Sequence, residues 1–188
     1  MNEEKKMIPT NEECFLLLGK FQVPSQVIAH SRVVHQVAFY LCQSLNLQGE
    51  GLDAAKVEAG ALLHDIAKVR SPDTEESHAQ AGSRILSRLG FPEVAEIVRQ
   101  HVVLDHEAGQ GAITEAEVVY YADKRVKHTA VVSLRERFQD LRERYGKRPE
   151  DRAWLESMER QTLFLEERIF QRMPLRPESL GEALNFGY

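Results

Sequence analysis

The sequence AGALLHDIAKVR, residues 59–70, predicts a buried helix. Apolar residues fall on nearly every side of this stretch, and a helix that is apolar all round belongs in a protein interior. The stretch nevertheless carries His64, Asp65 and Lys68, which project toward one side of such a helix. Burying these polar groups without partners costs several kcal/mol. Because an adjacent imidazole and carboxylate readily share a divalent cation, the stretch also predicts a metal site.

The composition is that of an ordinary globular protein, with 188 residues of which 43% are hydrophobic and 28% charged. This length suits one domain. The net charge of −5 gives no reason to expect a surface that binds nucleic acid. No apolar run approaches the roughly 20 residues that span a bilayer, and the charged N-terminus lacks a signal-peptide core. With only two cysteines, Cys14 and Cys42, we expect reduced thiols in a cytoplasmic protein that binds neither nucleic acid nor a membrane.

Helical patterns surround the central stretch, and strand patterns are nearly absent. The motif TEAE at residues 114–117 is a capping box that begins one of these helices. Residues 131–145 and 150–172 predict an antiparallel helical hairpin with charged outer faces. The other helices are expected at residues 12–19, 25–45, 53–69 and 77–89 and from Pro92 onwards.

We therefore predict an all-α protein, a helical bundle with a C-terminal helical hairpin. Three segments are expected: an N-terminal segment at residues 1–24, a core domain at 25–128, and a helical extension at 129–188 that packs on the core. The charged stripe of the hairpin is compatible with a homodimer surface and with a lid over a site.

Four of the seven histidines fall at buried or half-buried helical positions, and two aspartates lie against apolar faces. A single buried histidine is more often a hydrogen-bonded core residue, but six such groups on five helices favour a metal centre, because helical bundles build such sites from facing side chains. Nitrogen and oxygen ligands without thiolate favour Fe, Mn, Co, Ni, Zn or Mg. His30 and His128 are expected on the surface. The six candidate ligands are His35, His64, Asp65, His78, His101 and Asp123.

The order His35, His64–Asp65, Asp123 resembles the H…HD…D signature of the HD-domain metal-dependent phosphohydrolases. The contexts HSRVV beside His35, ALLHDIAK at residues 61–68 and YYADKR at residues 120–125 also resemble those of this family. The resemblance covers roughly residues 28–128. It implies the HD-type helical bundle, and one metal ion held by the four residues of the signature.

Two further histidines resemble the extra ligands of HD proteins that hold two metals, which include the HDIG-type group and the diadenosine tetraphosphate hydrolase branch called YqeK. They are His78 in HAQAGSRIL and His101 in VRQHVV. By this resemblance they hold a second ion, with Asp65 bridging the two. Ala67 stands where the HDIG group has glycine, and HVVLDHE replaces the H-T-x-G of the YqeK branch. The GYP motif of the cyclic-di-GMP phosphodiesterases is absent.

A pair of metal ions can supply hydroxide near neutral pH and clamp a phosphoryl group for in-line attack. Asp65 is then a catalytic residue as the bridging ligand, and Lys68 would contact a substrate phosphate as a point charge. His106, Arg125 and Lys127 are further candidates for substrate contacts. The alternatives are a solvated loop for the histidine and salt bridges for the two cations.

The expected function is that of a phosphomonoesterase or phosphodiesterase that uses metal-activated water on a nucleotide or another small phosphate ester. One alternative is a regulatory module that keeps the metal site and binds a nucleotide. Another is an oxygenase with a di-iron site, a class known in the same superfamily. Metal identity and phosphate release distinguish the hydrolase from the oxygenase.

Overall fold

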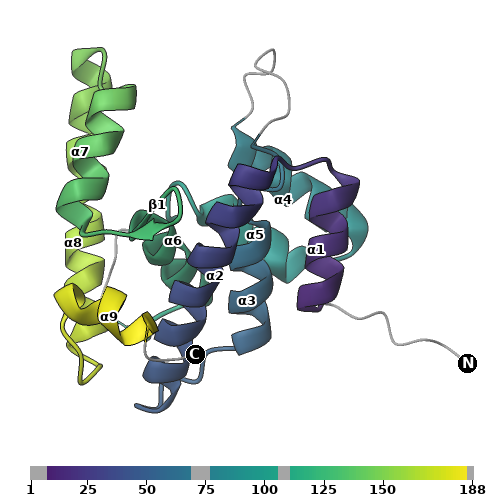
Figure 1. The fold of residues 1–188 in the computed structure, drawn as a ribbon, viewed down its shortest axis with the longest axis horizontal. Coiled ribbons are helices and arrows are strands. Elements are labelled where there is room, and N and C mark those ends of the chain that lie inside the picture. The colour runs from purple at the N-terminus through teal and green to yellow at the C-terminus, as the bar shows by residue number, and fades with distance from the viewer. Residues whose placement is uncertain (1–7, 69–76, 106–110, 186–188) are drawn as a thin grey trace, which may run out of the picture.

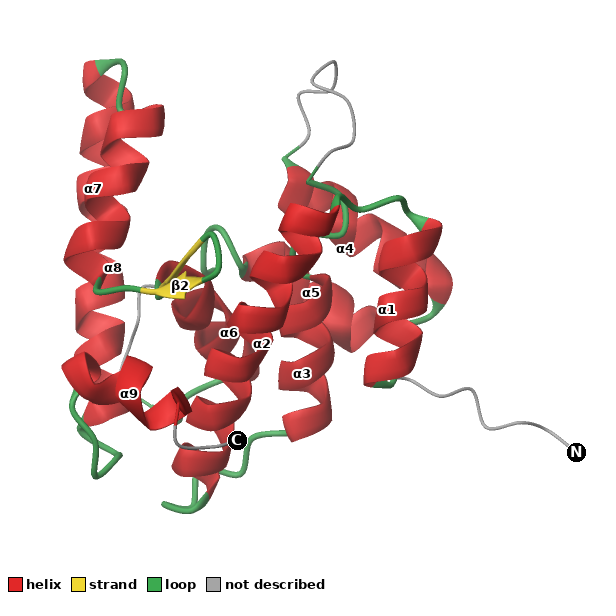
Figure 2. Cartoon of the chain, in the orientation of Figure 1, coloured by secondary structure: helices red, strands yellow, loops and turns green. Residues whose placement is uncertain are grey.

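The computed structural model describes residues 8–68, 77–105 and 111–185, and helices dominate it (Figure 1). The one departure in these residues is a pair of short antiparallel strands, with Val126 opposite Val131 (Figure 2). The predicted all-α class is confirmed. None of the described helices is both long and apolar enough to cross a membrane. The elements are α1 Asn11–Lys20, α2 Ser25–Asn46, α3 Ala54–Leu63, α4 His78–Leu89, α5 Pro92–Gln100, α6 Glu115–Lys124, β1 Val126–Lys127, β2 Ala130–Val131, α7 Leu134–Tyr145, α8 Pro149–Phe170, the 3-10 turn η1 Pro177–Ser179, and α9 Leu180–Asn185.

Local capping chemistry begins several of these helices where the sequence predicts. In α6, the Thr114 hydroxyl accepts a hydrogen bond from the backbone N–H of Glu117, and the Glu117 carboxylate accepts one from the backbone N–H of Thr114. The same reciprocal arrangement satisfies backbone groups at the starts of α1, α4 and α7. The capping box predicted at residues 114–117 is therefore confirmed.

Two clusters of buried side chains form the core. One joins α2 and α6 to α8 and the C-terminal segment, and the other joins α1 and α3 to the α4–α5 hairpin. Gly60 allows α3 to approach α5 closely, because a Cβ atom at this position would lie 2.6 Å from Cγ2 of Ile97. These contacts fix the end of α3, from which the HD dipeptide follows, against the surrounding helices.

The α7–α8 hairpin stands beside the bundle along the left of Figure 1. The second half of α8 packs on α6, where Leu165 and Ile169 are fully buried and Tyr120 is hydrogen-bonded to Thr162 at 2.9 Å. The turn between α7 and α8 lies at the far end of the hairpin from this contact. The boundaries of the three expected segments stay predictions.

The central helix is shorter than predicted. α3 ends at Leu63, and residues 64–68 continue in tight turns, with the N–H of Ile66 donating to Leu63 and the N–H of Lys68 donating to Asp65. The Nδ1 atom of His64 lies 2.7 Å from the Ala61 carbonyl oxygen. That oxygen would accept the next helical hydrogen bond, so the side chain of His64 competes with continuation of the helix. The prediction of a helix to residue 69 was wrong at this end.

Candidate metal centre

Six histidine and aspartate side chains from five parts of the fold lie close together. His30 comes from α2, and Asp123 comes from α6. The dipeptide His64–Asp65 directly follows α3. The last two, His78 at the start of α4 and His101 at the end of α5, come from the helical pair that packs on α3.

The first donor set consists of His30, His64, Asp65 and Asp123. The Nε2 atom of His30 lies 3.0 Å from Oδ1 of Asp123, and Nε2 of His64 lies 3.7 Å from the same oxygen. His64 also lies 3.3 Å from Oδ2 of Asp65. All four residues are buried. Nitrogen and oxygen atoms therefore face a common point in the protein interior.

The second donor set consists of Asp65, His78 and His101. The Nε2 atoms of the two histidines lie 3.1 Å apart, and Oδ1 of Asp65 lies 3.4 Å from His78 and 3.6 Å from His101. The two oxygens of Asp65 thus face different sets, since Oδ2 faces His64. Groups of donor atoms that fit a metal ion occur in both sets.

Backbone carbonyl groups fix the orientation of three of the histidine rings. The Nδ1 atoms of His30, His64 and His101 lie 2.9, 2.7 and 2.6 Å from the carbonyl oxygens of His128, Ala61 and Val98. Because a carbonyl only accepts hydrogen bonds, each Nδ1 carries a hydrogen, and in the neutral ring each Nε2 then has its lone pair directed to the centre. Metal-binding histidines are commonly held in this way.

The convergence leaves buried polar atoms that a cation would satisfy. Within the described residues, Nε2 of His64 and Oδ1 of Asp65 have no hydrogen-bond partner. Burial raises the pKa of Asp65, but the neighbouring His64 and His101 outweigh this effect and hold that pKa well below its usual range. Burial, reinforced by the charge of His101, lowers the pKa of His78 to about 4. An ionised carboxylate and a neutral imidazole are the forms that bind metals, and Asp65 and His78 are held in these forms. Burial lowers the pKa of His64, but Asp65 and Asp123 outweigh it and raise that pKa, and a divalent cation would take the place of the proton beside these carboxylates. The residues present therefore fit a divalent cation.

Two lysines adjoin the donor sets. Lys68 pairs with Oδ2 of Asp65 at 2.5 Å, and its half-exposed side chain also borders a cavity described below. Lys124 is buried, and its ammonium group donates to Oδ2 of Asp123 and to the carbonyl of His101, both at 2.9 Å. Lys124 therefore pairs with its neighbouring carboxylate.

The structure does not bring His35 to the centre. Its Nε2 atom lies 3.5 Å from Glu58, and its ring stacks on Phe39. His30, which we expected on the surface, is 8% exposed and occupies the corresponding place, so that expectation was wrong. Along an α-helix, side chains that are five residues apart differ in direction by about 140°, so His30 and His35 project to different sides of α2. The sequence did carry the signal, because His30 precedes Val34 by four residues and continues the buried stripe of α2.

The other predicted substrate contacts do not lie in the centre. Arg125 is 3% exposed, and its guanidinium donates to the Tyr121 hydroxyl and to two backbone carbonyls and pairs with Glu166. Lys127 pairs with Asp140 at 3.1 Å. In the structure both cations thus form salt bridges or structural hydrogen bonds, which is one of the two alternatives that the sequence left open. His106 lies outside the described residues.

A cavity of about 440 Å³ opens beside the donor sets. Asp65, His78, His101 and Asp123 line one side of it, together with the two lysines. The other side consists of residues of α7 and α8. The sequence left open that this hairpin covers a site, but it did not single out these six residues. These are Arg137, Leu141, Tyr145, Trp154, Leu155 and Met158.

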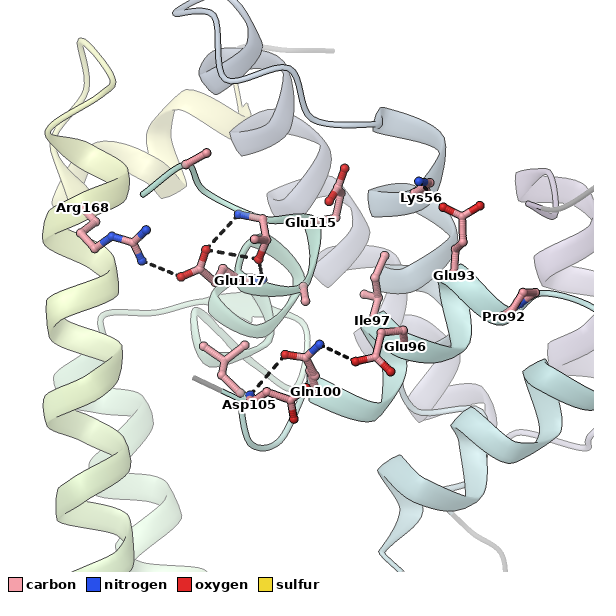
Figure 3. Close-up of a pocket in the computed structure, with 14 residues that line it drawn as sticks. Lys56, Pro92, Glu93, Glu96, Ile97, Gln100, Asp105, Glu115, Glu117 and Arg168 are labelled. Atoms are coloured by element: carbon pink, nitrogen blue, oxygen red, sulfur yellow. Dashed lines mark hydrogen bonds and ion pairs between the residues drawn. The ribbon is translucent and has the colours of Figure 1, made fainter. Parts of the chain in front are cut away.

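A larger cavity of about 750 Å³ lies elsewhere, between α3, α5, α6 and α8, and no residue of the donor sets lines it (Figure 3). Two pairs of its charged side chains neutralise each other, Glu117 with Arg168 and Glu93 with Lys56. The smaller cavity is therefore the one that adjoins the candidate metal centre.

A family model named HD domain matches residues 27–126. The chain belongs to the HD domain family. Members of this family bind divalent metals and are generally metal-dependent hydrolases, which agrees with the converging histidines and aspartates. The family was recognised correctly from the sequence.

Curated relatives are similar to parts of this HD domain protein. Ribonuclease Y of Fervidobacterium nodosum is 36% identical over 116 residues, which are 59% of this chain and 21% of the relative. A tRNA (cytidine(56)-2′-O)-methyltransferase of Picrophilus torridus is 26% identical over 72% of this chain and 42% of its own length. An uncharacterized protein of Methanocaldococcus jannaschii is 28% identical over 64% of this chain and 78% of its own length. The chain thus spans less than half the length of the first two, and no solved structure matches it significantly.

Proposed function

We propose that this chain is a phosphohydrolase that cleaves the phosphoester bond of a nucleotide or another small phosphorylated molecule with metal-activated water. The observation that carries the proposal is the position of Asp65. One of its carboxylate oxygens faces His64 and the other faces His78 and His101, and the residue also lines the cavity. A shared carboxylate between two donor sets is suited to a pair of ions that act on one phosphoryl group.

The first donor set would hold one divalent cation, and the second donor set would hold another. When bound, such ions lower the pKa of a coordinated water and offset the charge of a phosphoryl group. The chain supplies the orientation, since the carbonyls of Ala61 and Val98 hold the rings of His64 and His101 with their Nε2 atoms toward the centre.

Lys68 would contact a substrate phosphate. Its ammonium group is anchored to Asp65, yet its side chain is 41% exposed and borders the cavity. An ammonium on a flexible stem can bind phosphate oxygen as a point charge without leaving its carboxylate. We therefore assign Lys68 to binding of the phosphoryl group that is cleaved.

RNA is a second candidate substrate, because two of the similar proteins are a ribonuclease and a tRNA methyltransferase. The chain covers 21% and 42% of those proteins, and its net charge of −5 favours a small ester over a long polyanion. An RNA oligonucleotide therefore belongs beside the small esters in the test.

The test is to purify the full chain without chelator and to measure bound metal together with phosphate release. The panel contains nucleoside monophosphates, dinucleoside polyphosphates, a generic phosphodiester and a short RNA. We expect Asp65→Asn to lose metal and to lower kcat by at least about 100-fold, since the variant removes the shared charge at constant shape. His35→Asn is the matched control, because His35 lies outside both sets.

Three results would contradict the proposal. If Asp65→Asn still hydrolyses the ester, then the hydrolysis does not depend on the metal centre. Metal-dependent consumption of oxygen without phosphate release would favour the oxygenase. Tight nucleotide binding without turnover in the presence of Mn²⁺ or Fe²⁺ would favour the regulatory module.

A further inference from the structure

We propose that the α7–α8 hairpin is the substrate-recognition wall of this site. Arg137 would bind the phosphate, while Tyr145 and Trp154 would hold an aromatic base. The inference rests on the proposed function for the role of the phosphate, but it concerns residues outside the stretch that the HD domain model matches, which ends at residue 126. It selects nucleoside phosphates over phosphate esters that lack a base.

The cavity has two chemically different ends. The end formed by the donor sets carries carboxylates, imidazoles and lysines, whereas most of the residues that α7 and α8 contribute to the cavity are apolar or aromatic. Leu155 and Met158 of α8 are buried beneath that wall, with 1% and 7% exposure. A ligand that fills the cavity would therefore carry charge at one end and an apolar surface at the other.

Arg137 adds a cation that is incompletely paired. Within the described residues its buried Nε atom has no hydrogen-bond partner. Its ion pair with Asp140 is long, with Nη1 3.4 Å from Oδ2 of that residue. Lys127 and Arg144 contact the other oxygen of Asp140 more closely, each at 3.1 Å. One carboxylate thus serves three cations, and the guanidinium of Arg137 keeps donors for a further anion.

The charges around the cavity also favour an anion. Three cations, Lys68, Lys124 and Arg137, line it together with two carboxylates, Asp65 and Asp123. Lys68 pairs closely with one of these carboxylates and Lys124 with the other. No carboxylate of the lining is therefore left to balance the charge of Arg137. A planar guanidinium binds phosphate through two parallel hydrogen bonds. Divalent cations in the donor sets would increase the demand for an anion.

Two aromatic side chains lie near the turn of the hairpin. Tyr145 ends α7 and is 58% exposed, and Trp154 in the first part of α8 is 48% exposed. Both line the cavity, next to Leu141 and Leu155. Exposed aromatic rings over an apolar floor suit the stacking of a nucleobase, which tolerates any base because every base has a π-face. The α7–α8 hairpin thus provides both Arg137 for the phosphate and two aromatic side chains for the base.

Trp154 provides a direct assay, because it is the only tryptophan of the chain. AMP, ribose 5-phosphate and inorganic phosphate are titrated into the Mn²⁺-loaded full chain, and its fluorescence is read by rapid mixing before turnover. We expect AMP to bind at least about ten-fold more tightly than ribose 5-phosphate, since stacking on an aromatic side chain contributes about that factor.

Variants separate the two ends of the cavity. Arg137→Leu should weaken the binding of all three probes by about ten-fold or more. Arg137→Lys keeps the charge but loses the paired donors of the guanidinium, so it should weaken their binding less. Tyr145→Ala should weaken AMP by about five- to ten-fold, and ribose 5-phosphate much less. The matched controls are Arg135→Leu on α7 and Phe164→Ala on α8, which change exposed residues outside the cavity lining.

The outcomes distinguish this inference from the proposed function. If AMP binds with the expected pattern but no ester is hydrolysed, the recognition wall is supported and the hydrolase is not. If esters are hydrolysed while Arg137→Leu and Tyr145→Ala bind AMP as the controls do, the recognition wall is overturned and the hydrolase stands. Equal affinity for AMP and ribose 5-phosphate would also overturn the role of the aromatic pair. A short RNA that competes with AMP would identify an RNA end as the source of the nucleoside phosphate.

Discussion

The imidazole of His30 lies 3.0 Å from the carboxylate of Asp123, although 93 residues separate them in the sequence. The other ring nitrogen of His30 is held 2.9 Å from the carbonyl of His128, just after α6 and β1. Both ends of the ring thus contact the segment that carries Asp123. The packing of α2 on α6 therefore completes the first donor set, and it selects His30 rather than His35.

The choice between these two histidines is testable by metal content. His30→Ala should lower metal affinity by more than the roughly 10–100-fold that loss of an outer-shell partner costs, because a direct donor is removed. His35→Ala should retain the metal, since His35 contacts Glu58 and Phe39 instead. Metal per chain after dialysis, measured by plasma mass spectrometry, checks both. A greater loss of metal from His35→Ala than from His30→Ala would contradict the geometry.

Removal of metal should lower the thermal stability of the folded chain. Without a cation, the buried Nε2 of His64 and Oδ1 of Asp65 lack partners. A metal at about 100 times its dissociation constant stabilises the folded state by about 2.7 kcal/mol. For a chain of this size, we expect EDTA to lower the melting temperature by roughly 5–10 °C, reversibly on addition of Mn²⁺. The same treatment of Asp65→Asn should change its melting temperature much less; an equal change would place the bound metal elsewhere.

Arg125 should contribute to stability rather than to substrate binding. Its guanidinium is buried and bonds to Tyr121, Glu166 and the carbonyl of Pro177, so it joins α6 to α8 and the C-terminal segment. Arg125→Met removes the donor to the Tyr121 hydroxyl and to the carbonyl of Pro177, and it removes the cation that pairs with Glu166. It should cost about 2–4 kcal/mol in the free energy of unfolding, measured with urea. The exposed Arg135→Met serves as control. An unchanged unfolding midpoint with a raised KM would instead restore the substrate role.

Both cysteine thiols should resist alkylation and disulfide exchange in the folded chain. Burial, with Glu13 and Glu58 adding to it, raises the pKa of Cys14 to about 12, and burial with Glu115 and other acids raises that of Cys42 to about 11. At pH 8 an aromatic disulfide reagent should therefore react at least about 100-fold more slowly with the folded than with the urea-unfolded chain. Fast reaction of one thiol in the folded chain would contradict its burial.

The same shifts predict a pH dependence of stability. The unfolded thiols ionise near pH 9, whereas the folded thiols stay protonated to about pH 11 or 12. Their contribution is therefore fully present below pH 9 and decreases as the pH rises through that window. The measurement is the free energy of unfolding in urea at pH 8 and at pH 10. Between these two pH values, it should fall less in the double variant Cys14→Ala, Cys42→Ala than in the unaltered chain.

Local signals in the sequence were sufficient for much of the fold. The capping box at residues 114–117, the long amphipathic pattern of α2 and the pattern of α8 each depend on neighbouring residues, and each appears close to the predicted place. The first helix of the hairpin, predicted from residue 131, begins only at Leu134, because Val131 pairs in the strand β2. The HD dipeptide and its family context identified the family. These features are local because hydrogen bonds and helical periodicity act within a few residues.

Other features depended on contacts between distant segments. The end of α3 at Leu63 follows from a side chain that competes for a backbone carbonyl, and the choice of His30 follows from the rotation of α2 against α6. The placement of Arg137 beside the centre depends on the packing of α8 on α6. The sequence by itself thus determined the all-α class, because helical periodicity is a local signal. It also determined the family, and with it most of the candidate donors, through the resemblance of the HD motif and its contexts. Only the tertiary structure decided which histidine meets Asp123 and which helices close the cavity, because burial and orientation are set by the packing of helices far apart in the chain.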